Sequence, residues 1–286
     1  MSKIILVSFI IFSILGFILK IILNRVNSKY IRQRANSVPK GFEEQIDLEN
    51  HQKAQRYSAA RLNFGIVSNF LSFIGLYISL FFIYGWVDGF IRDNFAFDPK
   101  VQGLLFFGIL SLISLIIGLP ESIYSTFVLE EKFGFNKTTP KIFILDLFKS
   151  VLLSVIIGAP FLYFLLYLMQ SLGQWWWFAG ASSFLVFQFF LIWAYPKFIA
   201  PLFNKFTPLK DVELEKEMNE LIQRANLNFK DYYVMNASMR SSHGNAYFTG
   251  FGKNKRIVFF DTLLKTLNTN EVIAAMAHEL GDLKHK

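Results

Sequence analysis

The stretch SVLLSVIIGAPFLYFLLYLMQSLGQWWWFAGASSFLVFQFFLIWAYP, residues 150–196, decides the class of this protein because it contains no Asp, Glu, Lys or Arg. A helix needs about 20 apolar residues to cross the hydrocarbon core of a bilayer, so this run is too long for one crossing. The polar segment 170–174, Gln-Ser-Leu-Gly-Gln, divides it. The run therefore predicts two membrane-spanning helices joined by a short turn.

Three earlier runs also lack charged residues, namely 4–19, 62–87 and 101–120. The chain is 53% hydrophobic and only 17% charged, whereas soluble domains carry about 25% charged residues. The tryptophans lie near the ends of these runs, as interfacial anchors do; they are Trp86, the cluster 175–177 and Trp193. The absence of cysteine excludes disulfides and thiolate chemistry. We predict an α-helical polytopic membrane protein with about five transmembrane helices.

The distribution of Lys and Arg predicts the orientation of these spans. One such residue precedes the first run, nine lie in 20–61, two in 88–100, four in 121–149, none in 170–174, and thirteen from Lys197 onward. The positive-inside rule then places the N-terminus outside and the tail in the cytosol. This placement accounts for the net charge of +8, so we expect no nucleic-acid partner. The first run is read as a retained helix, with a cleaved signal peptide as the alternative.

Three charged residues lie close to the predicted spans. Asp146 and Lys149 are spaced i, i+3 at the entry to the fourth span, and Glu121 follows Pro120 at the end of the third. Charges near lipid usually turn inward and pair, so Asp146 and Lys149 are candidates for an internal ion pair. Snorkelling of each side chain to the interface is the alternative for all three residues.

The tail is predicted to be a small α/β unit. Leu214, Met218, Leu221 and Ile222 recur at helical spacing after Asp211, and residues 231–235 have the composition of a strand. Residues 246–251, the turn 252–255 and the run 256–260 predict a β-hairpin. Asn268 and Glu271 form a capping box for a last helix. We therefore predict a membrane domain over 1–208 and a smaller α/β domain over 209–286.

The last helix carries the segment AAMAHELGD, residues 274–282. In the zinc-protease signature H-E-x-x-H, two histidines at i and i+4 bind Zn²⁺ and the glutamate after the first is the general base. His278 and Glu279 fit this pattern, but Asp282 occupies the second ligand position. Asp282 is either a weaker carboxylate ligand, a lesion or a surface residue. His285 lies about 10 Å along the helix from His278, too far for one ion to bind both.

Four further stretches resemble the type I CAAX prenyl proteases, a family of integral-membrane zinc metalloproteases. They are HQKAQRY at 51–57, YSTFVLEEKFGFNKTTP at 124–140, IAPLFNKFTPL at 199–209 and SSHGNAYFTGFG at 241–252. The resemblance implies that residues 209–286 are a partial zincin-like protease domain, with a Zn²⁺ ion held by His278 and Asp282 and with Glu279 as base. It also implies a substrate-binding strand edge made by His243, Asn245, Ala246, Tyr247 and Phe248.

In such a family a downstream glutamate is the third zinc ligand and two further membrane helices close a chamber around the site. The resemblance thus implies that this chain corresponds to about the first two thirds of that architecture and is impaired. The implied function is hydrolysis of peptide bonds near the membrane, either of the C-terminal tripeptide of prenylated CAAX proteins or in membrane-protein quality control. A non-catalytic pseudoprotease or membrane fragment is the alternative. We expect a bacterial inner membrane rather than the endoplasmic reticulum.

Overall fold

The computed structural model describes residues 3–44, 46–225, 227, 229, 231–250 and 255–285, and the side chains among them up to Gly281. The chain divides into two compact units, Met1–Phe133 and Gly134–Lys286. In the described part, five helices are long and apolar enough to cross a membrane, which confirms the predicted number; they are Lys3–Arg34, Leu48–Asn94, Pro99–Glu130, Pro140–Ser171 and Gly173–Phe203. Each helix extends beyond the charge-free run that predicts it.

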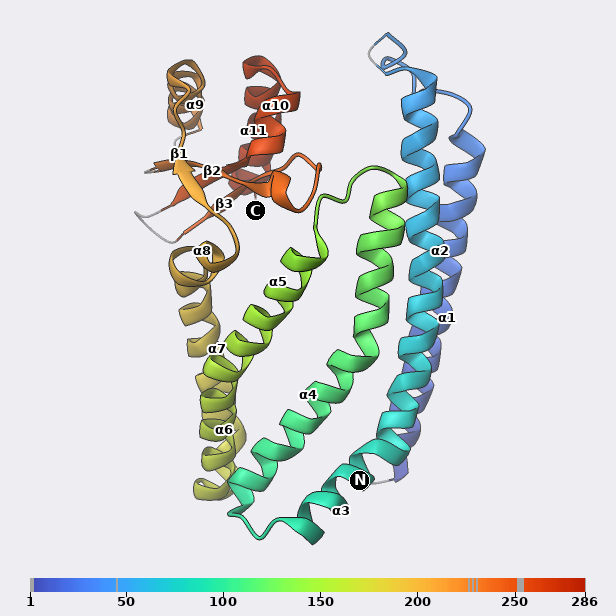
Figure 1. Cartoon of the computed structure of the whole chain (residues 1–286), viewed down its shortest axis with the longest axis vertical. Helices are drawn as coiled ribbons and strands as arrows, with labels where there is room; N and C mark the ends of the chain where they lie inside the picture. The colour runs from blue at the N-terminus through green and yellow to red at the C-terminus, as the bar shows by residue number, and fades with distance from the viewer. Residues whose placement is uncertain are drawn as a thin grey trace. The chain divides into compact units, whose positions relative to one another are not determined.

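The first unit contains the first three of these long helices. Its segments are α1 (Lys3–Arg34), α2 (Leu48–Ile78), a π-helical turn (Ser79–Ile83), α3 (Tyr84–Asn94), α4 (Pro99–Tyr124) and a second π-helical turn (Ser125–Glu130). Figure 1 shows α1 and α2 running side by side. Phe17 stacks on Phe73 with 4.3 Å between ring centroids. Lys20, which ends the charge-free run of α1, donates a hydrogen bond to Asn69 of α2 at 3.2 Å.

The helix starts in this unit follow from local sequence. Asp47 caps α2 by accepting a hydrogen bond from the Asn50 amide at 2.7 Å. Asp98 caps α4 in the same way, with Pro99 in the first turn, where its missing N–H costs nothing. Glu121 accepts a hydrogen bond from the Ser68 hydroxyl, so this carboxylate has a partner on a neighbouring helix. The snorkelling alternative is therefore not needed for Glu121.

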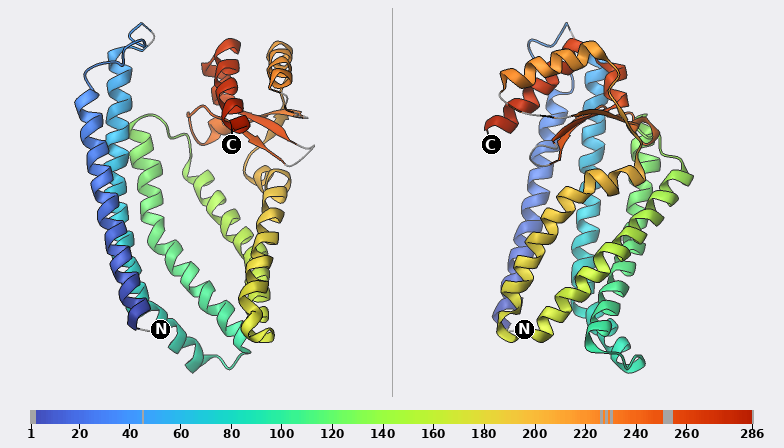
Figure 2. Two further views of the ribbon diagram at one scale, coloured as in Figure 1. Left: turned by 180° about the vertical axis from the view of Figure 1, so that it is seen from behind. Right: turned by 90° about the vertical axis from the view of Figure 1, so that its left-hand side faces the viewer.

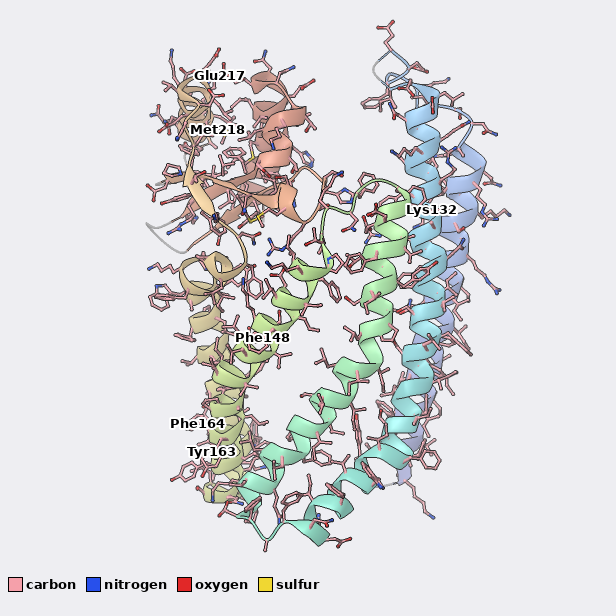
Figure 3. The ribbon with its side chains drawn as sticks, viewed as in Figure 1. Lys132, Phe148, Tyr163, Phe164, Glu217 and Met218 are labelled. Atoms are coloured by element: carbon pink, nitrogen blue, oxygen red, sulfur yellow. The ribbon has the colours of Figure 1, made fainter. Side chains whose placement is uncertain are left out.

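The second unit begins with two long helices. Their segments are α5 (Pro140–Leu153), a π-helical turn (Ser154–Gly158), α6 (Ala159–Ser171), a 3₁₀ turn (Gly173–Trp175), α7 (Trp176–Ala194), a π-helical turn (Tyr195–Ile199) and α8 (Ala200–Phe203). Gly173 turns the chain between α6 and α7 with φ of +51°, a value that favours glycine. Phe161 and Phe187 stack across this helical hairpin at 3.8 Å. Figure 3 shows Phe148, Tyr163 and Phe164 on α5 and α6, where all three are exposed, as lipid-facing side chains would be.

A mixed sheet follows in the same unit. Its strands are β1 (Phe206–Pro208), β2 (Asp231–Met235), β3 (Ala246–Thr249) and β4 (Arg256–Phe260), in the order β1-β2-β4-β3. β2 is parallel to β4, and the two outer strands are antiparallel to their neighbours. The helices are α9 (Val212–Arg224), the short α10 (Asp261–Thr266) and α11 (Thr269–His285). Figure 2 shows α9 and α11 covering the same face of the sheet.

The core of this α/β region explains its strand pattern. Ile257, Val258 and Phe259 of β4 are all buried, because β4 lies inside the sheet and both of its faces are covered. Ile257 and Phe259 pack with α9 and α11, while Val258 packs on the other face with Met235. Met218, labelled on α9 in Figure 3, is completely buried in the first of these clusters. Burial of such a side chain stabilises the fold by about 2 kcal/mol.

Most of the predicted elements of the tail are confirmed. Asp211 caps α9 by accepting from the Leu214 amide at 3.0 Å. β2 covers 231–235, and β3 and β4 form the predicted antiparallel hairpin. Within its predicted turn, residues 252–254 lie outside the described part of the chain. The capping box is reciprocal: the Asn268 amide donates to Glu271 at 2.8 Å and the Glu271 amide to Asn268 at 3.0 Å. The division at residue 208 stays a prediction.

Candidate active site

Helix α11 presents His278 and Glu279 on its exposed side. Its buried side consists of Val272, Met276 and Leu280, spaced at i, i+4 and i+8 and packed against the sheet. This spacing fixes the rotation of the helix and leaves the two signature residues exposed. The helix continues through residue 285, so position 282 lies one turn beyond His278 on the same face. The side chains of Asp282 and His285 lie outside the described part of the structure.

Strand β3, which contains three of the predicted substrate-binding residues, is at one edge of the sheet. Ala246, Tyr247 and Phe248 pair with β4 on one side, and no described strand lies on the other. An edge strand offers backbone N–H and C=O groups that a second extended chain can pair with. Burial raises the pKa of the Tyr247 hydroxyl, and Tyr195 adds to the effect. The phenol therefore stays neutral across the physiological range.

The segment that leads into β3 is held in place by several contacts. The His243 ring is exposed and stacks on Phe135 at 4.2 Å. Its carbonyl accepts a hydrogen bond from the Thr262 hydroxyl at 2.8 Å. At Gly244 a Cβ atom would lie 3.3 Å from the Cα of Leu263, so the chain passes too close to α10 for a larger residue to fit easily.

Asn245 continues this held segment. Its carbonyl accepts from the Phe260 amide at 2.9 Å, and its side-chain oxygen accepts from the Ala246 amide at 2.8 Å. Three of the predicted substrate-binding residues thus lie in the edge strand, and His243 and Asn245 lie in the held segment that leads into it. Their contact with a substrate stays a prediction.

Arg240 is a structural residue that the sequence did not single out. Its guanidinium donates two hydrogen bonds to Asp146 of α5, at 2.7 and 3.0 Å. It also donates to the Asn204 side chain at 2.9 Å and to the Phe203 carbonyl at 2.7 Å, both at the end of α8. The Arg240 carbonyl accepts from the Lys137 amide at 3.0 Å. This one residue therefore ties the segment before β3 to α5 and α8.

The predicted ion pair between Asp146 and Lys149 is wrong. Asp146 pairs with Arg240, while Lys149 donates to the Leu202 carbonyl at 2.8 Å and lies over the Phe203 ring. The position of the Asp146 carboxylate in an apolar helix correctly indicated that it has a cationic partner. The bidentate guanidinium prevails over a lysine one turn away because it matches both carboxylate oxygens at once.

A second carboxylate lies directly after β4, at the start of α10. Asp261, the first residue of α10, accepts hydrogen bonds from the Ser238 amide, at 2.8 Å, and from the Ser238 hydroxyl. Partial burial opposes ionisation, but the two bonds from Ser238 and the nearby Lys265 outweigh it and lower the pKa of Asp261. The ionised carboxylate thereby connects the 3₁₀ turn Ala237–Met239 to α10.

The described side chains around α11 do not form a complete metal site. Among them, no group of three His, Asp or Glu residues lies close enough to hold a metal ion. His278 is a zinc-ligand type on an exposed helix face, and the residue one turn later is a carboxylate. A catalytic zinc site needs three protein ligands, so the described residues do not complete one.

Comparison with known proteins decides the family. The family profile "CAAX prenyl protease N-terminal, five membrane helices" matches residues 27–205, and the profile "Peptidase family M48" matches residues 208–286. The chain belongs to the CAAX prenyl protease family. This result confirms the resemblance seen in the sequence and the membrane-plus-zincin fold class.

Individual members of the CAAX prenyl protease family agree over most of this chain. CAAX prenyl protease 1 of Saccharomyces cerevisiae is 37% identical over 278 residues, which cover 88% of this chain and 58% of the yeast protein. The homologue from Arabidopsis thaliana is 37% identical, covering 87% and 60%. The crystal structure of S. mikatae Ste24p matches with a TM-score of 0.86 and 37% identity, covering 96% of this chain and 65% of that one.

Two consequences follow from these comparisons. The chain spans 51% to 68% of the length of the curated relatives, so the activity of a whole CAAX prenyl protease is a proposal for this chain. It is an integral, multi-pass membrane protein of a metalloprotease family. The yeast and plant relatives are eukaryotic, and they give no support to the expected bacterial inner membrane.

Proposed function

We propose that this protein is a membrane zinc metalloendopeptidase of the CAAX prenyl protease type, weakened by the residue at position 282. The observation that carries the proposal is the His278-Glu279 pair on the exposed side of α11, within the segment that matches peptidase family M48. The substrate class is the C-terminal segment of prenylated CAAX proteins, with other membrane proteins as a broader set. The relatives carry the CAAX prenyl protease name.

Each residue has a proposed role. His278 is a zinc ligand, Asp282 a poor second ligand and Glu279 the general base that accepts a proton from the attacking water. When bound, zinc supplies a Lewis acid to this chemistry. The β3 edge with His243 and Asn245 aligns an extended peptide by strand addition, which its position at the end of the sheet supports.

Asp282 also supports a second candidate function. A carboxylate is shorter than an imidazole and adds negative charge, so Asp282 would hold a zinc ion less well than histidine and would leave it a weaker Lewis acid. A protein that retains the substrate edge but cleaves slowly or not at all would act as a substrate-binding pseudoprotease. The two candidates share β3 and differ in whether Glu279 acts as the base of a hydrolytic reaction.

We also propose that the tail faces the cytosol, from the alternation of Lys-rich and Lys-poor segments. The substrate edge would then meet the soluble C-terminal segments of prenylated proteins at the cytosolic surface. The choice of membrane stays a prediction.

Zinc content and cleavage of a prenylated CAAX peptide test the proposal together. We expect the unmodified protein to retain zinc at least about tenfold more weakly than Asp282→His, a loss at the low end of what altered ligand environments cause. Any cleavage should disappear in Glu279→Gln and persist in Glu220→Gln, a matched change on the exposed face of α9.

Equal zinc retention by the unmodified protein and Asp282→His would refute the claim that the carboxylate weakens the site. Cleavage that survives Glu279→Gln would refute the assigned base.

A further inference from the structure

A hollow in the first unit lies between α1, α2 and the residues that follow the π-helical turn Ser125–Glu130. Its volume is about 740 Å³. Ile31, Ala35, Ala59, Ala60 and Phe133 make its apolar part, and the small alanines leave the space open. Among the described residues that line it, the charged ones are Arg32, Lys53, Arg56 and Lys132, and none is Asp or Glu. Figure 3 labels Lys132 close to α2.

These four cations have no anionic partner among the side chains that the structure describes. Among the described residues, none of them forms an ion pair with a carboxylate, and all four are exposed. Lys53 and Arg56 are spaced i, i+3 on one helix face, where like charges repel by a few tenths of a kcal/mol. A bound anion would relieve this repulsion.

A second hollow of about 500 Å³ continues the basic surface along α1. It shares Arg32 and Asn63 with the first and adds Arg25 and Lys29. Lys29 lies four residues after Arg25 and three before Arg32, so the same face of α1 repeats a positive charge at every turn. The combined surface therefore suits a ligand with more than one negative charge.

The depth of the hollow matches the headgroup layer of a membrane. Arg56 precedes Leu62, the start of a charge-free run, by six residues, or about 9 Å of helix. The headgroup layer extends about 5–7 Å beyond the hydrocarbon on each side, and an arginine side chain can bridge the difference. Basic pockets between transmembrane helices at this depth are typical sites for phosphorylated lipid headgroups.

We propose that this hollow binds the headgroup of an anionic phospholipid that carries a phosphomonoester. Arg32 and Arg56 would hold the phosphate oxygens with their planar forks, since guanidinium matches phosphate in a bidentate way. Lys53 and Lys132 would supply further positive charge, and the amide side chains of Gln52 and Asn63 line the remaining space. A phosphomonoester carries a charge of about −1.5 to −2 at neutral pH. It therefore neutralises more of the positive charge of these side chains than a phosphodiester does.

The experiment measures lipid binding to the full chain in detergent by native mass spectrometry and by the shift in thermal unfolding. The probes are dioctanoyl phosphatidic acid, dioctanoyl phosphatidylcholine and inorganic phosphate at equal concentration. Phosphatidic acid should bind and raise the unfolding temperature, whereas the other two should do neither. An equal shift with inorganic phosphate would overturn the lipid assignment, because a free anion would then suffice.

The variant Arg32→Gln/Arg56→Gln tests the residues. Its affinity for phosphatidic acid should fall at least about tenfold for each arginine, since a hydrogen bond to a charged group contributes about 1.5–3 kcal/mol. The matched control, Arg92→Gln/Arg224→Gln, removes two exposed arginines that already pair with carboxylates of their own helices. It should change the affinity less than twofold.

Equal losses in both double variants would overturn the proposal, because binding would then reflect overall charge. The variant Arg32→Lys/Arg56→Lys tests whether misfolding explains the loss of affinity in the Gln variant. It keeps the positive charge and should lose affinity for phosphatidic acid by a smaller factor than the Gln variant. If that variant binds as poorly as the Gln variant while unfolding at the same temperature as the unmodified protein, the headgroup site is not charge-driven and the proposal fails.

Discussion

The ion pair between Arg240 and Asp146 offers the sharpest test of how this fold holds its candidate substrate edge. The two side chains are 25% and 24% exposed and are joined by hydrogen bonds of 2.7 and 3.0 Å. Breaking a fully buried pair costs about 3–5 kcal/mol, and exposed pairs contribute about 0.2–1 kcal/mol. For this partly buried pair we expect Asp146→Asn to lower the free energy of unfolding by about 2–3 kcal/mol, since Arg240 keeps its bonds to Asn204 and Phe203.

The assay is a double-mutant cycle with Asp146→Asn, Arg240→Gln and the combined variant, unfolded by denaturing detergent. The coupling energy should be about 1–3 kcal/mol. A cysteine at Ser242, in a chain that has none of its own, reports on the segment before β3: its labelling should be faster in Asp146→Asn, because Ser242 is bonded to Gly134 and Phe135 across the same segment. The control is Asp88→Asn, which breaks an exposed pair with Arg92 and should cost less than about 1 kcal/mol.

The reasoning is refuted if Asp146→Asn costs no more than Asp88→Asn, or if the cycle shows no coupling. Faster labelling without coupling would mean that Asp146 supports the segment by another route.

Two further predictions use other parts of the chain. Single cysteines at Asn94 and Glu220 should react with an impermeant maleimide from opposite sides of the membrane, and labelling of both from one side would overturn the proposed topology. Burial, with a contribution from Glu215, raises the pKa of Tyr232 to about 12. The pKa of Tyr232 is thus higher in the folded than in the unfolded chain, where it is about 10. This difference stabilises the folded state fully below about pH 10, and the stabilisation is lost as the pH rises towards about 12. The free energy of unfolding should therefore fall between about pH 10 and 12 in the unmodified protein and change less there in Tyr232→Phe; equal slopes would contradict the assignment.

Local features of the sequence determined the number of membrane spans and the starts of several helices. The charge-free runs located five spans because the thickness of a bilayer sets the length of an apolar helix. Asp211, Asn268 and Glu271 marked the starts of α9 and α11 because capping hydrogen bonds join residues only three apart. The buried side of α11 follows a local rule as well, since Val272, Met276 and Leu280 recur at i, i+4 and i+8, although we recognised this stripe only in the structure.

The tertiary structure decided what depends on residues far apart in the chain. The hairpin of β3 and β4 is visible in the sequence, but β3 becomes the edge only because β2 pairs in parallel on the far side of β4. The short strand β1 is added to the opposite edge by pairing with β2. The position of Asp146 in an apolar helix indicates that it has a partner. In the folded chain that partner is Arg240, 94 residues later, and not the nearby Lys149. Sequence spacing cannot choose among distant partners, because only the folded chain determines which guanidinium reaches both carboxylate oxygens.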